Sequence, residues 1–477
     1  MKIQVENMGA LQQAEFELGD LTILCGGNNT GKTYATYALY GFLSGWREAI
    51  SIPIPEETIR ALLSDGVVHI DVAEYQKDAA VFLEKGCVAY TERLPTIFAA
   101  SKERFRDSTF HIGIEPDELD ISGKYERVVK AAENNIGLFS LTKEQDGAGL
   151  NIALLVDKEG IKIPHNVIMQ VIGLALKKIL FGSLFHETFI ASAERTGAVI
   201  FRRELDFSRN RVVDKVDRFF GEIGKGGDKI NPIKLLSTFV DKDEGYEGYA
   251  LPVNENVDFT RKLEDISKKT SFISENHPEI LSDFSDIVGG EYTVTQHDQL
   301  YFLPRGKRGV RLTMDESSSA VRSLLDIGFY LKHLAKPGDI LMVDEPELNL
   351  HPENQRRVAR LFARLVNIGI KIFITTHSDY IVKELNTLIM LNGGRSHLER
   401  IAREEGYLPE ELLRPEQIRV YIAEEGLIKQ EGKKRRSKGL TLTPADIDPE
   451  LGIEVGSFDT TIDTMNRIQE EIVWGDE

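Results

Sequence analysis

The sequence predicts an α/β fold in which strands from both ends of the 477-residue chain form one sheet. Residues 21–25 are an apolar strand that leads into a glycine-rich loop and then into a helical pattern. Residues 340–343 and 371–375 are two further apolar runs, and each is followed by polar residues and a helical pattern. Continuous apolar runs of this length are typical of parallel strands buried on both faces. We therefore expect a mixed sheet with flanking helices.

The order of these patterns divides the chain into four segments. Residues 1–90 alternate between strand and helix patterns and form the N-terminal part of the core, which contains the glycine-rich loop. Residues 91–289 are mostly helical and charged, and we expect an inserted helical lobe with one core strand near 187–197. Residues 290–394 return to the α/β pattern, and residues 395–477 form a short C-terminal extension.

Composition and charge limit the classes of protein to which this chain can belong. The formal net charge of −18 argues against a surface that binds nucleic acid throughout, but it is compatible with a local basic patch. Cys25 and Cys87 lack metal-ligand spacing, and so few cysteines are typical of the reduced cytoplasmic compartment. The most apolar long stretch, residues 167–185, contains Lys177 and Lys178, so we expect a buried helix there and no membrane span.

The glycine-rich loop matches the complete phosphate-loop pattern G-x-x-x-x-G-K-[ST]. Its candidate nucleotide-binding residues are Gly26, Gly27, Asn28, Asn29, Thr30, Gly31, Lys32 and Thr33. Glycines let successive backbone N–H groups point at phosphate oxygens, and the following helix N-terminus adds its dipole. Lys32 would supply a point charge to the β- and γ-phosphates of ATP, and the Thr33 hydroxyl would ligate Mg²⁺. The alternative is a glycine turn that precedes Lys-Thr by chance, but the strand before it and the helix after it argue against this.

Two acidic residues and one histidine follow the later apolar runs. Asp344 and Glu345 end the first run, and His377 follows the second. Parallel sheets bind ligands at the carboxyl ends of their strands, where Asp344 could hold Mg²⁺, Glu345 could activate a water and His377 could sense the γ-phosphate. The alternatives are carboxylates that only end a strand and a histidine with a structural role. Glu345, His377 and Lys32 are thus the candidate catalytic residues. The candidate metal ligands are Asp344 and Thr33.

A serine-rich turn and an arginine complete the set of motifs. Residues 317–322 have the sequence Ser-Ser-Ser-Ala-Val-Arg and precede a helical pattern, so their serines could cap the helix or contact phosphate. Arg195 closes the short strand expected near 187–197. It could contact phosphate, hold the neighbouring loop or pair with Glu194 or another acidic residue. The residues alone leave these alternatives open.

These motifs occur in the order found in one large group of ATPases. The phosphate loop, the serine-rich turn and the segments 340–352 and 375–378 resemble the ABC-type ATPases of the SMC, RecF and OLD group. Within that group the chain resembles the Septu-type PtuA ATPases of antiphage defence, which lack a long coiled coil. The resemblance is strong over residues 1–45 and 310–392. It implies a P-loop NTPase fold of the ABC-ATPase head type.

The resemblance also implies a head-to-head dimer, or a higher even oligomer, in which two chains enclose ATP. Ser318 and Ser319 would then contact the γ-phosphate held by the phosphate loop of the second chain. The group usually has a glycine where this chain has Ala320, and a methyl group there restricts close backbone approach. This departure leaves the hydrolysis rate open, so a nucleotide-gated scaffold with little hydrolysis is a second functional hypothesis.

The role implied by the resemblance is that of a sensor or regulator in a bacterial antiphage system, which controls a separate effector nuclease. A RecF-like repair ATPase that clamps DNA is the alternative. The dense basic run in this acidic chain comprises Lys433, Lys434, Arg435 and Arg436. It could contact nucleic acid or an acidic partner surface, or form a solvated loop.

Overall fold

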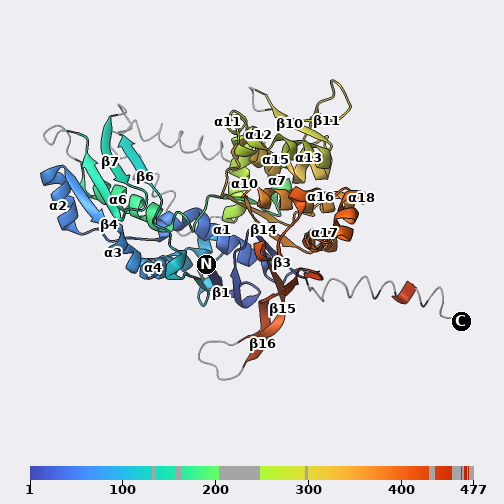
Figure 1. Ribbon diagram of the computed structural model, residues 1–477, viewed down its shortest axis with the longest axis horizontal. Coiled ribbons are helices and arrows are strands. Elements are labelled where there is room, and N and C mark those ends of the chain that lie inside the picture. Colours follow the sequence, from blue (N-terminus) through green and yellow to red (C-terminus); the bar gives the residue numbers. More distant parts are fainter. Residues whose placement is uncertain are drawn as a thin grey trace, which may run out of the picture.

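A central six-stranded sheet lies in the middle of the molecule (Figure 1). The computed structural model describes residues 1–130, 136–156, 163–202, 248–295, 299–428 and 436–453, together with 464, 467–469 and 471. In spatial order the sheet contains β16 (Ser437–Pro444), β15 (Ile418–Ile428), β3 (Leu21–Cys25), β14 (Lys371–Thr376), β13 (Ile340–Asp344) and β9 (Thr188–Ala191). The strands from β15 to β9 are parallel, and β16 pairs antiparallel with β15. This arrangement confirms the predicted α/β fold with a mixed sheet.

The central strands are buried because helices cover both faces of the sheet. All residues of β3 and β13 are buried. Ile340 and Met342 belong to one hydrophobic core, which also contains residues of α1 (Lys32–Ala49). Leu341 and Val343 belong to a second core, with residues of α16 (Pro352–Asn367) and α17 (Asp379–Leu391). Alternate side chains of one strand therefore enter two different cores, which explains the uninterrupted apolar sequence of β13.

A three-stranded antiparallel sheet covers the outer side of α1. Its order is β2 (Leu11–Glu17), β1 (Lys2–Met8) and β5 (Thr109–Gly113). Ile3 and Val5 point into the same core as α1, whereas Lys2 is exposed. This alternation is the pattern of a strand with one buried face.

The inserted region differs from the helical lobe that the sequence predicts, because it contains a second antiparallel sheet. This sheet has the order β4 (Val67–Asp71), β8 (Gly149–Leu154), β7 (Gly137–Lys143) and β6 (Tyr125–Lys130). Leu150 and Ile152 of β8 are buried, as are Phe139 and Leu141 of β7. The strands are short and the residues of β6 are largely exposed, so their period-two pattern is weak in the sequence.

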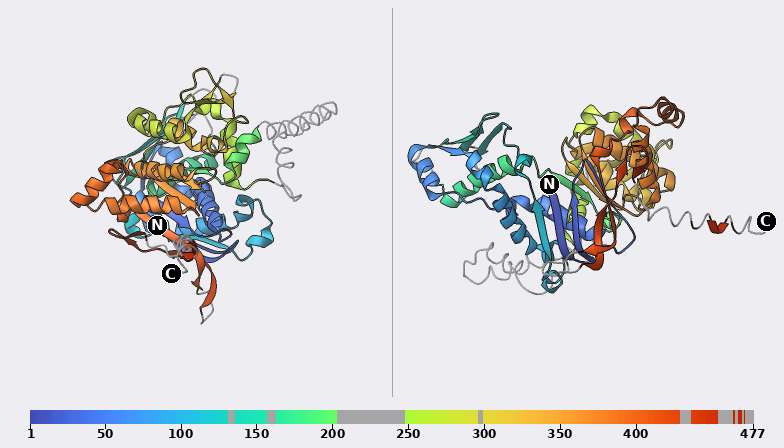
Figure 2. Two further views of the ribbon diagram at one scale, coloured as in Figure 1. Left: turned by 90° about the vertical axis from the view of Figure 1, so that its right-hand side faces the viewer. Right: turned by 60° about the horizontal axis from the view of Figure 1, so that its bottom comes forward.

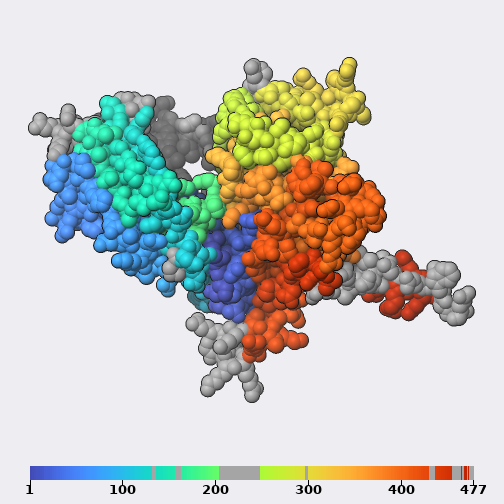
Figure 3. All heavy atoms as spheres, in the orientation of Figure 1, coloured from blue at the N-terminus to red at the C-terminus, as the bar shows by residue number. Residues whose placement is uncertain are grey.

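Helices pack against this outer sheet and connect it to the core. They are α2 (Glu56–Asp65), α3 (Val72–Lys77), α4 (Ala79–Thr91), α5 (Leu94–Ile97) and α6 (His165–Phe181). α6 is the buried helix expected near 167–185, with Ile168, Ile172 and Leu176 inside. Figure 3 shows the lobe around β4–β8 as a projection on one side of the molecule.

A second lobe lies above the opposite part of the central sheet, as the views in Figure 2 also show. It consists of α7 (Arg195–Ile200), α10 (Leu251–Arg261), α11 (Leu263–Ile266), α12 (Phe272–Asn276), α13 (Pro278–Val288), β10 (Gly290–Val294), β11 (Leu300–Pro304) and β12 (Leu312–Thr313). The helix expected after the serine-rich turn is broken into α14 (Ser319–Ser323), α15 (Leu325–Phe329) and a π-helical turn, η3 (Tyr330–Leu334).

The C-terminal extension is not separate from the core, because β15 and β16 complete the central sheet. They form a hairpin that projects at the lower edge in Figure 1. The remaining elements are α18 (Ser396–Glu404), β17 (Ile447–Asp448) and β18 (Gly452–Ile453). The division into four segments remains a proposal, and β9 is the core strand expected near 187–197.

Candidate active site at the carboxyl edge of the central sheet

The strand register brings three distant motifs to one edge of the sheet. Asp344 at the end of β13 is opposite Thr375 of β14, and Thr375 is opposite Leu24 of β3. The phosphate loop follows β3, and His377 follows β14. The three motifs therefore lie side by side where parallel sheets bind their ligands.

The phosphate loop has the backbone conformation that its glycines permit. Gly26 has φ 135° and Gly31 has φ 92°, and both values lie in the region that favours glycine. Asn28 and Asn29 are exposed at the tip of the loop. The Thr30 hydroxyl donates to the Gly27 carbonyl at 2.8 Å, which closes the turn. The loop thus leads into the N-terminus of α1, a position suited to an anion.

Lys32 lies inside this loop. Its side chain is 6% exposed, and its Nζ donates to the carbonyls of Gly26 at 2.9 Å and Gly27 at 2.7 Å. Burial lowers the pKa of Lys32, and the carboxylates of Glu345 and Asp344 oppose this effect. The ammonium group is therefore close to the acidic end of β13, and phosphate oxygens would be better acceptors for it than neutral carbonyls. Thr33 follows in the first turn of α1 and is partly buried.

Asp344 is fully buried at the end of β13. One of its oxygens accepts a hydrogen bond from the Thr375 hydroxyl, and the other has no hydrogen-bond partner among the described residues. Burial raises the pKa of Asp344 to about 6. An unsatisfied buried carboxylate oxygen is costly unless a ligand completes it, so this residue fits a site for Mg²⁺.

Glu345 has an unusual backbone conformation, with φ 52°. Its N–H donates to the Thr375 carbonyl at 3.1 Å and approaches the Thr375 hydroxyl at 3.2 Å. Its own carbonyl accepts from Arg195 at 2.9 Å. The side chain is 27% exposed, and Oε1 lies 3.7 Å from Nδ1 of His377. Hydrogen bonds thus hold the main chain of Glu345 at both its N–H and its carbonyl, and its carboxylate is partly exposed to solvent.

Glu347 is a residue of this site that the sequence analysis did not single out. Its Oε1 accepts from the Thr376 hydroxyl at 2.9 Å and from the His377 N–H at 2.7 Å, and it lies 3.2 Å from Nδ1 of His377. Glu347 therefore fixes both the backbone and the ring of the histidine. The only available signal was an acidic residue two positions after Glu345.

Arg195 is completely buried behind the strand ends. Its guanidinium donates to the carbonyls of Asp344 at 2.7 Å and Glu345 at 2.9 Å. Glu194 instead accepts from the Tyr37 hydroxyl at 2.7 Å. Of the roles left open by the sequence, the contacts match the one in which Arg195 holds the neighbouring loop.

The serine-rich turn forms the start of α14. Ser318 caps the helix and accepts from the N–H of Val321 at 3.3 Å, and Ser319 accepts from Arg322 at 3.2 Å. Capping is thus confirmed. Ser318 and Ser319 are both exposed, so contact with a phosphate held by a second chain remains a prediction. Ala320 follows them in the first turn of α14 and is partly buried.

The predicted basic run lies between β15 and β16 in the sequence. Lys433, Lys434 and Arg435 lie outside the described residues, and Arg436 is exposed just before β16.

In the described part of the chain, no helix is both long and apolar enough to cross a bilayer. The same residues contain no cluster of three His, Cys, Asp or Glu side chains with the geometry of a metal site.

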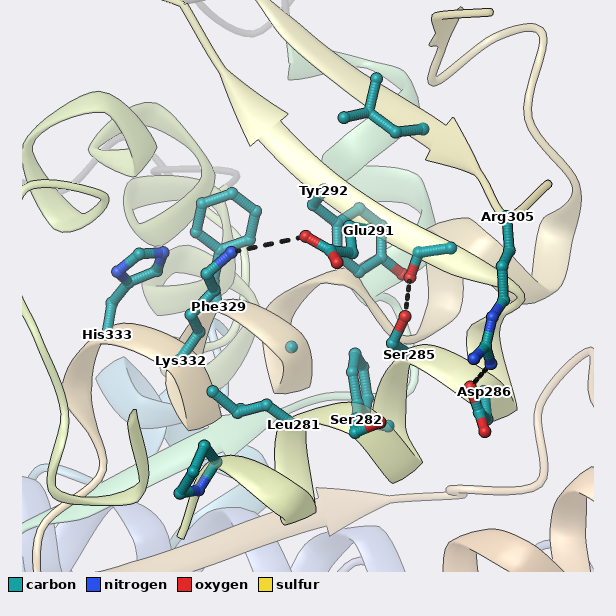
Figure 4. A pocket seen from close by; sticks show the side chains of 15 residues that line it. Leu281, Ser282, Ser285, Asp286, Glu291, Tyr292, Arg305, Phe329, Lys332 and His333 are labelled. Atoms are coloured by element: carbon teal, nitrogen blue, oxygen red, sulfur yellow. Dashed lines mark hydrogen bonds and ion pairs between the residues drawn. The ribbon is translucent and has the colours of Figure 1, made fainter. Parts of the chain in front are cut away.

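A separate cavity of about 610 Å³ lies in the second lobe, between α13, β10–β11 and η3 (Figure 4). Phe329 and Tyr292 form apolar walls, and the Lys332 ammonium lies 4.0 Å from the Glu291 carboxylate. The cavity shares no residue with the sheet edge. The Tyr292 hydroxyl donates to the Val321 carbonyl of α14 at 2.5 Å, which connects its wall to the serine-rich turn.

A known protein family matches part of this chain. Residues 233–382 match the AAA_15 family, described as an AAA ATPase domain. The matched segment includes the serine-rich turn, Asp344, Glu345 and His377, and it begins after the phosphate loop. No curated protein matches the chain. The family match, together with the phosphate loop at the sheet edge, indicates a P-loop ATPase fold.

Two solved structures are similar over most of both chains, although at low identity. One is an SMC head domain from Thermotoga maritima, with 10% identity, a TM-score of 0.29, and 94% of this chain and 98% of that chain covered. The other is an SmcHead bound to the C-winged helix domain of ScpA, with 11% identity, a TM-score of 0.31, and coverage of 92% and 97%.

Proposed function

We propose that this chain binds ATP with Mg²⁺ at the carboxyl edge of the central sheet and hydrolyses it to ADP and phosphate. The observation that supports the proposal is the strand order at one edge of the sheet, where β14 lies between β3, which leads into the phosphate loop with Lys32, and β13, which ends at Asp344 and is followed by Glu345. A phosphate loop, a buried carboxylate with an open oxygen and a second, solvent-facing carboxylate are the parts that phosphoryl transfer to water requires.

Each residue has a distinct role in this proposal. The N–H groups of the phosphate loop and the Lys32 ammonium bind the β- and γ-phosphates. Thr33 and Asp344 would hold Mg²⁺, which when bound neutralises charge on the phosphate oxygens. Glu345 orients a water and accepts its proton while the water oxygen bonds to the γ-phosphorus and the bond to the bridging oxygen breaks. His377 is in reach of the same carboxylate and would contact the γ-phosphate.

We further propose that two chains pair head to head around two nucleotides. The exposure of Ser318 and Ser319 at the N-terminus of α14 supports this, because both hydroxyls are accessible to a second molecule. A phosphate bound to the phosphate loop of one chain would then contact the serine-rich turn of the other.

Substitution of Glu345 by Gln tests the proposed hydrolysis. Gln keeps the shape of the side chain but cannot accept a proton, so the phosphate release rate should fall about a hundredfold or more while ATP stays bound. Glu384→Gln is the control, because it makes the same substitution on α17, where Glu384 pairs with Arg356 away from the sheet edge. Normal turnover in Glu345→Gln would remove Glu345 from the chemistry, and no turnover in the wild type would favour the scaffold hypothesis.

The biological role that we propose is that of a cytoplasmic sensor or regulator in antiphage defence, which controls a separate effector nuclease. The proposal of this role rests on the resemblance of the chain to the Septu-type PtuA ATPases. The test is coexpression with the products of neighbouring genes, followed by nuclease assays with ATP and with a non-hydrolysable analogue. A co-purifying nuclease whose activity depends on the nucleotide would support the proposal. Salt-dependent binding of duplex DNA by the isolated chain would favour the RecF-like alternative.

A further inference from the structure

Arg195 makes hydrogen bonds that join three separate elements of the fold. It is the first residue of α7 and is completely buried. Its Nε donates to the Ser323 carbonyl at 2.7 Å, and its terminal nitrogens donate to the carbonyls of Ser192 at 2.8 Å, Asp344 at 2.7 Å and Glu345 at 2.9 Å. One side chain thus links the end of β9, the end of β13 and helix α14.

These contacts rule out a direct role for Arg195 in binding phosphate. The side chain is 0% exposed, and its donors are directed at main-chain carbonyls. Any effect of Arg195 on the reaction must therefore pass through another residue. Within this set, Asp344 is a proposed Mg²⁺ ligand, and Glu345 is the residue whose carboxylate is proposed to act on the water.

The conformation of Glu345 explains why such a contact is needed. A φ of 52° is disfavoured for any residue with a Cβ, so it persists only where the surroundings hold it. Thr375 holds the N–H side of Glu345, and Arg195 holds its carbonyl. Loss of the guanidinium would leave the second side free, and the carboxylate would no longer be directed consistently at the water.

We propose that Arg195 is a positioning residue that keeps Glu345 in its reactive conformation and ties it to α14, which carries the serine-rich turn. The inference rests on the proposed ATP hydrolysis and deepens it. It also predicts that α14 and the hydrolytic carboxylate move together, because one guanidinium bonds to both.

Arg195→Lys tests this role, because lysine keeps the positive charge but lacks the planar fork that reaches several carbonyls. We expect kcat to fall by about tenfold or more, with the dissociation constant for ATP unchanged within about twofold. Arg195→Gln keeps two planar N–H donors but lacks the charge, and we expect a similar fall in kcat. This second variant provides a separate test if Arg195→Lys does not fold. Circular dichroism and ATP binding check that both variants are folded.

A double-mutant cycle separates positioning of Glu345 from a general structural effect. In the Glu345→Gln background the carboxylate is already absent, so adding Arg195→Lys should lower kcat by less than about twofold further. Tyr292→Phe is the matched control, because it removes another hydrogen bond to the main chain of α14 but leaves Glu345 untouched. Figure 4 shows Tyr292 at the cavity wall. We expect its kcat to stay within about threefold of the wild type.

The outcomes distinguish this inference from the proposed function. An active wild type, an inactive Glu345→Gln and an unaffected Arg195→Lys would overturn the inference alone. Equal losses of kcat in Tyr292→Phe and Arg195→Lys would also overturn the inference, since they would show that both substitutions act through α14 and not through Glu345. Loss of ATP binding in both Arg195 variants would likewise overturn it. A wild type without ATP hydrolysis would overturn both the proposed function and the inference.

Discussion

Asp326 shows how burial sets the charge of a single side chain. It lies on α15, is 1% exposed, and neither of its carboxyl oxygens has a hydrogen-bond partner within the described chain. Burial raises the pKa of Asp326 to about 7, and the Arg195 guanidinium opposes this shift. The site therefore favours the neutral form of the carboxyl group up to neutral pH.

We expect Asp326 to make the folded protein less stable as the pH rises. Its folded-state pKa of about 7 lies above the ordinary value of 3.8, so the folded state binds more protons in this window. The contribution to stability is present below pH 3.8 and is lost as the pH rises through 7. The Asn side chain of Asp326→Asn does not titrate. The Tm of this variant minus the Tm of the wild type should therefore increase from pH 5 to pH 8 in thermal unfolding. A constant difference over that range would contradict the raised pKa.

The residues of the site differ in how far their roles could be predicted from the sequence. Lys32 and Thr33 follow from a local pattern, because the phosphate loop is contiguous. The hydrogen bonds of Glu347 to His377, and of Arg195 to Glu345, join residues from different strands and helices. Such contacts depend on tertiary packing, so the sequence left the role of Arg195 among several alternatives and did not indicate the role of Glu347.

At the scale of secondary-structure elements, the strands that are buried on both faces could be predicted from the sequence. β3 and β13 are short, continuous apolar runs, because each of their faces enters a core. In the outer sheet β6 has no fully buried residue, and β7 and β8 alternate between buried and less buried positions, so no continuous apolar run marked these three strands in the sequence. The break between α14 and α15 was also missed. The Ser323 carbonyl at this break accepts a hydrogen bond from Arg195, which is distant in the sequence.

The junction between the phosphate loop and α1 should not tolerate a Cβ at Gly31. Its φ of 92° is disfavoured for other residues, and a Cβ there would lie 2.6 Å from Cγ of Leu11. Gly31→Ala should therefore destabilise the fold by at least about 1–2 kcal/mol and weaken ATP binding. Gly173→Ala on α6 is the control, because a Cβ there meets no atom within 4 Å and alanine should stabilise a helix by about 0.5–1 kcal/mol. Chemical denaturation and titration with a fluorescent ATP analogue would measure both effects, and wild-type ATP affinity in Gly31→Ala would contradict this account of the loop.

At the scale of the whole molecule, the central sheet explains why the motifs are so far apart in sequence. β3 from the N-terminal segment lies between β14 and β15, which come from the last third of the chain. The sheet edge cannot form until these distant segments meet, so the candidate site depends on completion of the core. The two lobes lie at different sides of the molecule (Figure 1), and Ser318 and Ser319 of the serine-rich turn are exposed.

The exposed serine-rich turn leads to a prediction about assembly. In the Glu345→Gln background bound ATP should persist, and two chains should remain paired through the serine-rich turns. Ser318→Arg adds a long charged side chain at that turn, so it should block pairing while each chain still binds ATP, since Ser318 is exposed and outside the phosphate loop. Sedimentation velocity with ATP and Mg²⁺ should show a dimer for Glu345→Gln and a monomer for the double variant. Ser396→Arg, at an exposed serine that begins α18, is the control and should leave the dimer intact. A dimer that persists in Ser318→Arg, or one that forms equally without ATP, would show that the chains pair through another surface.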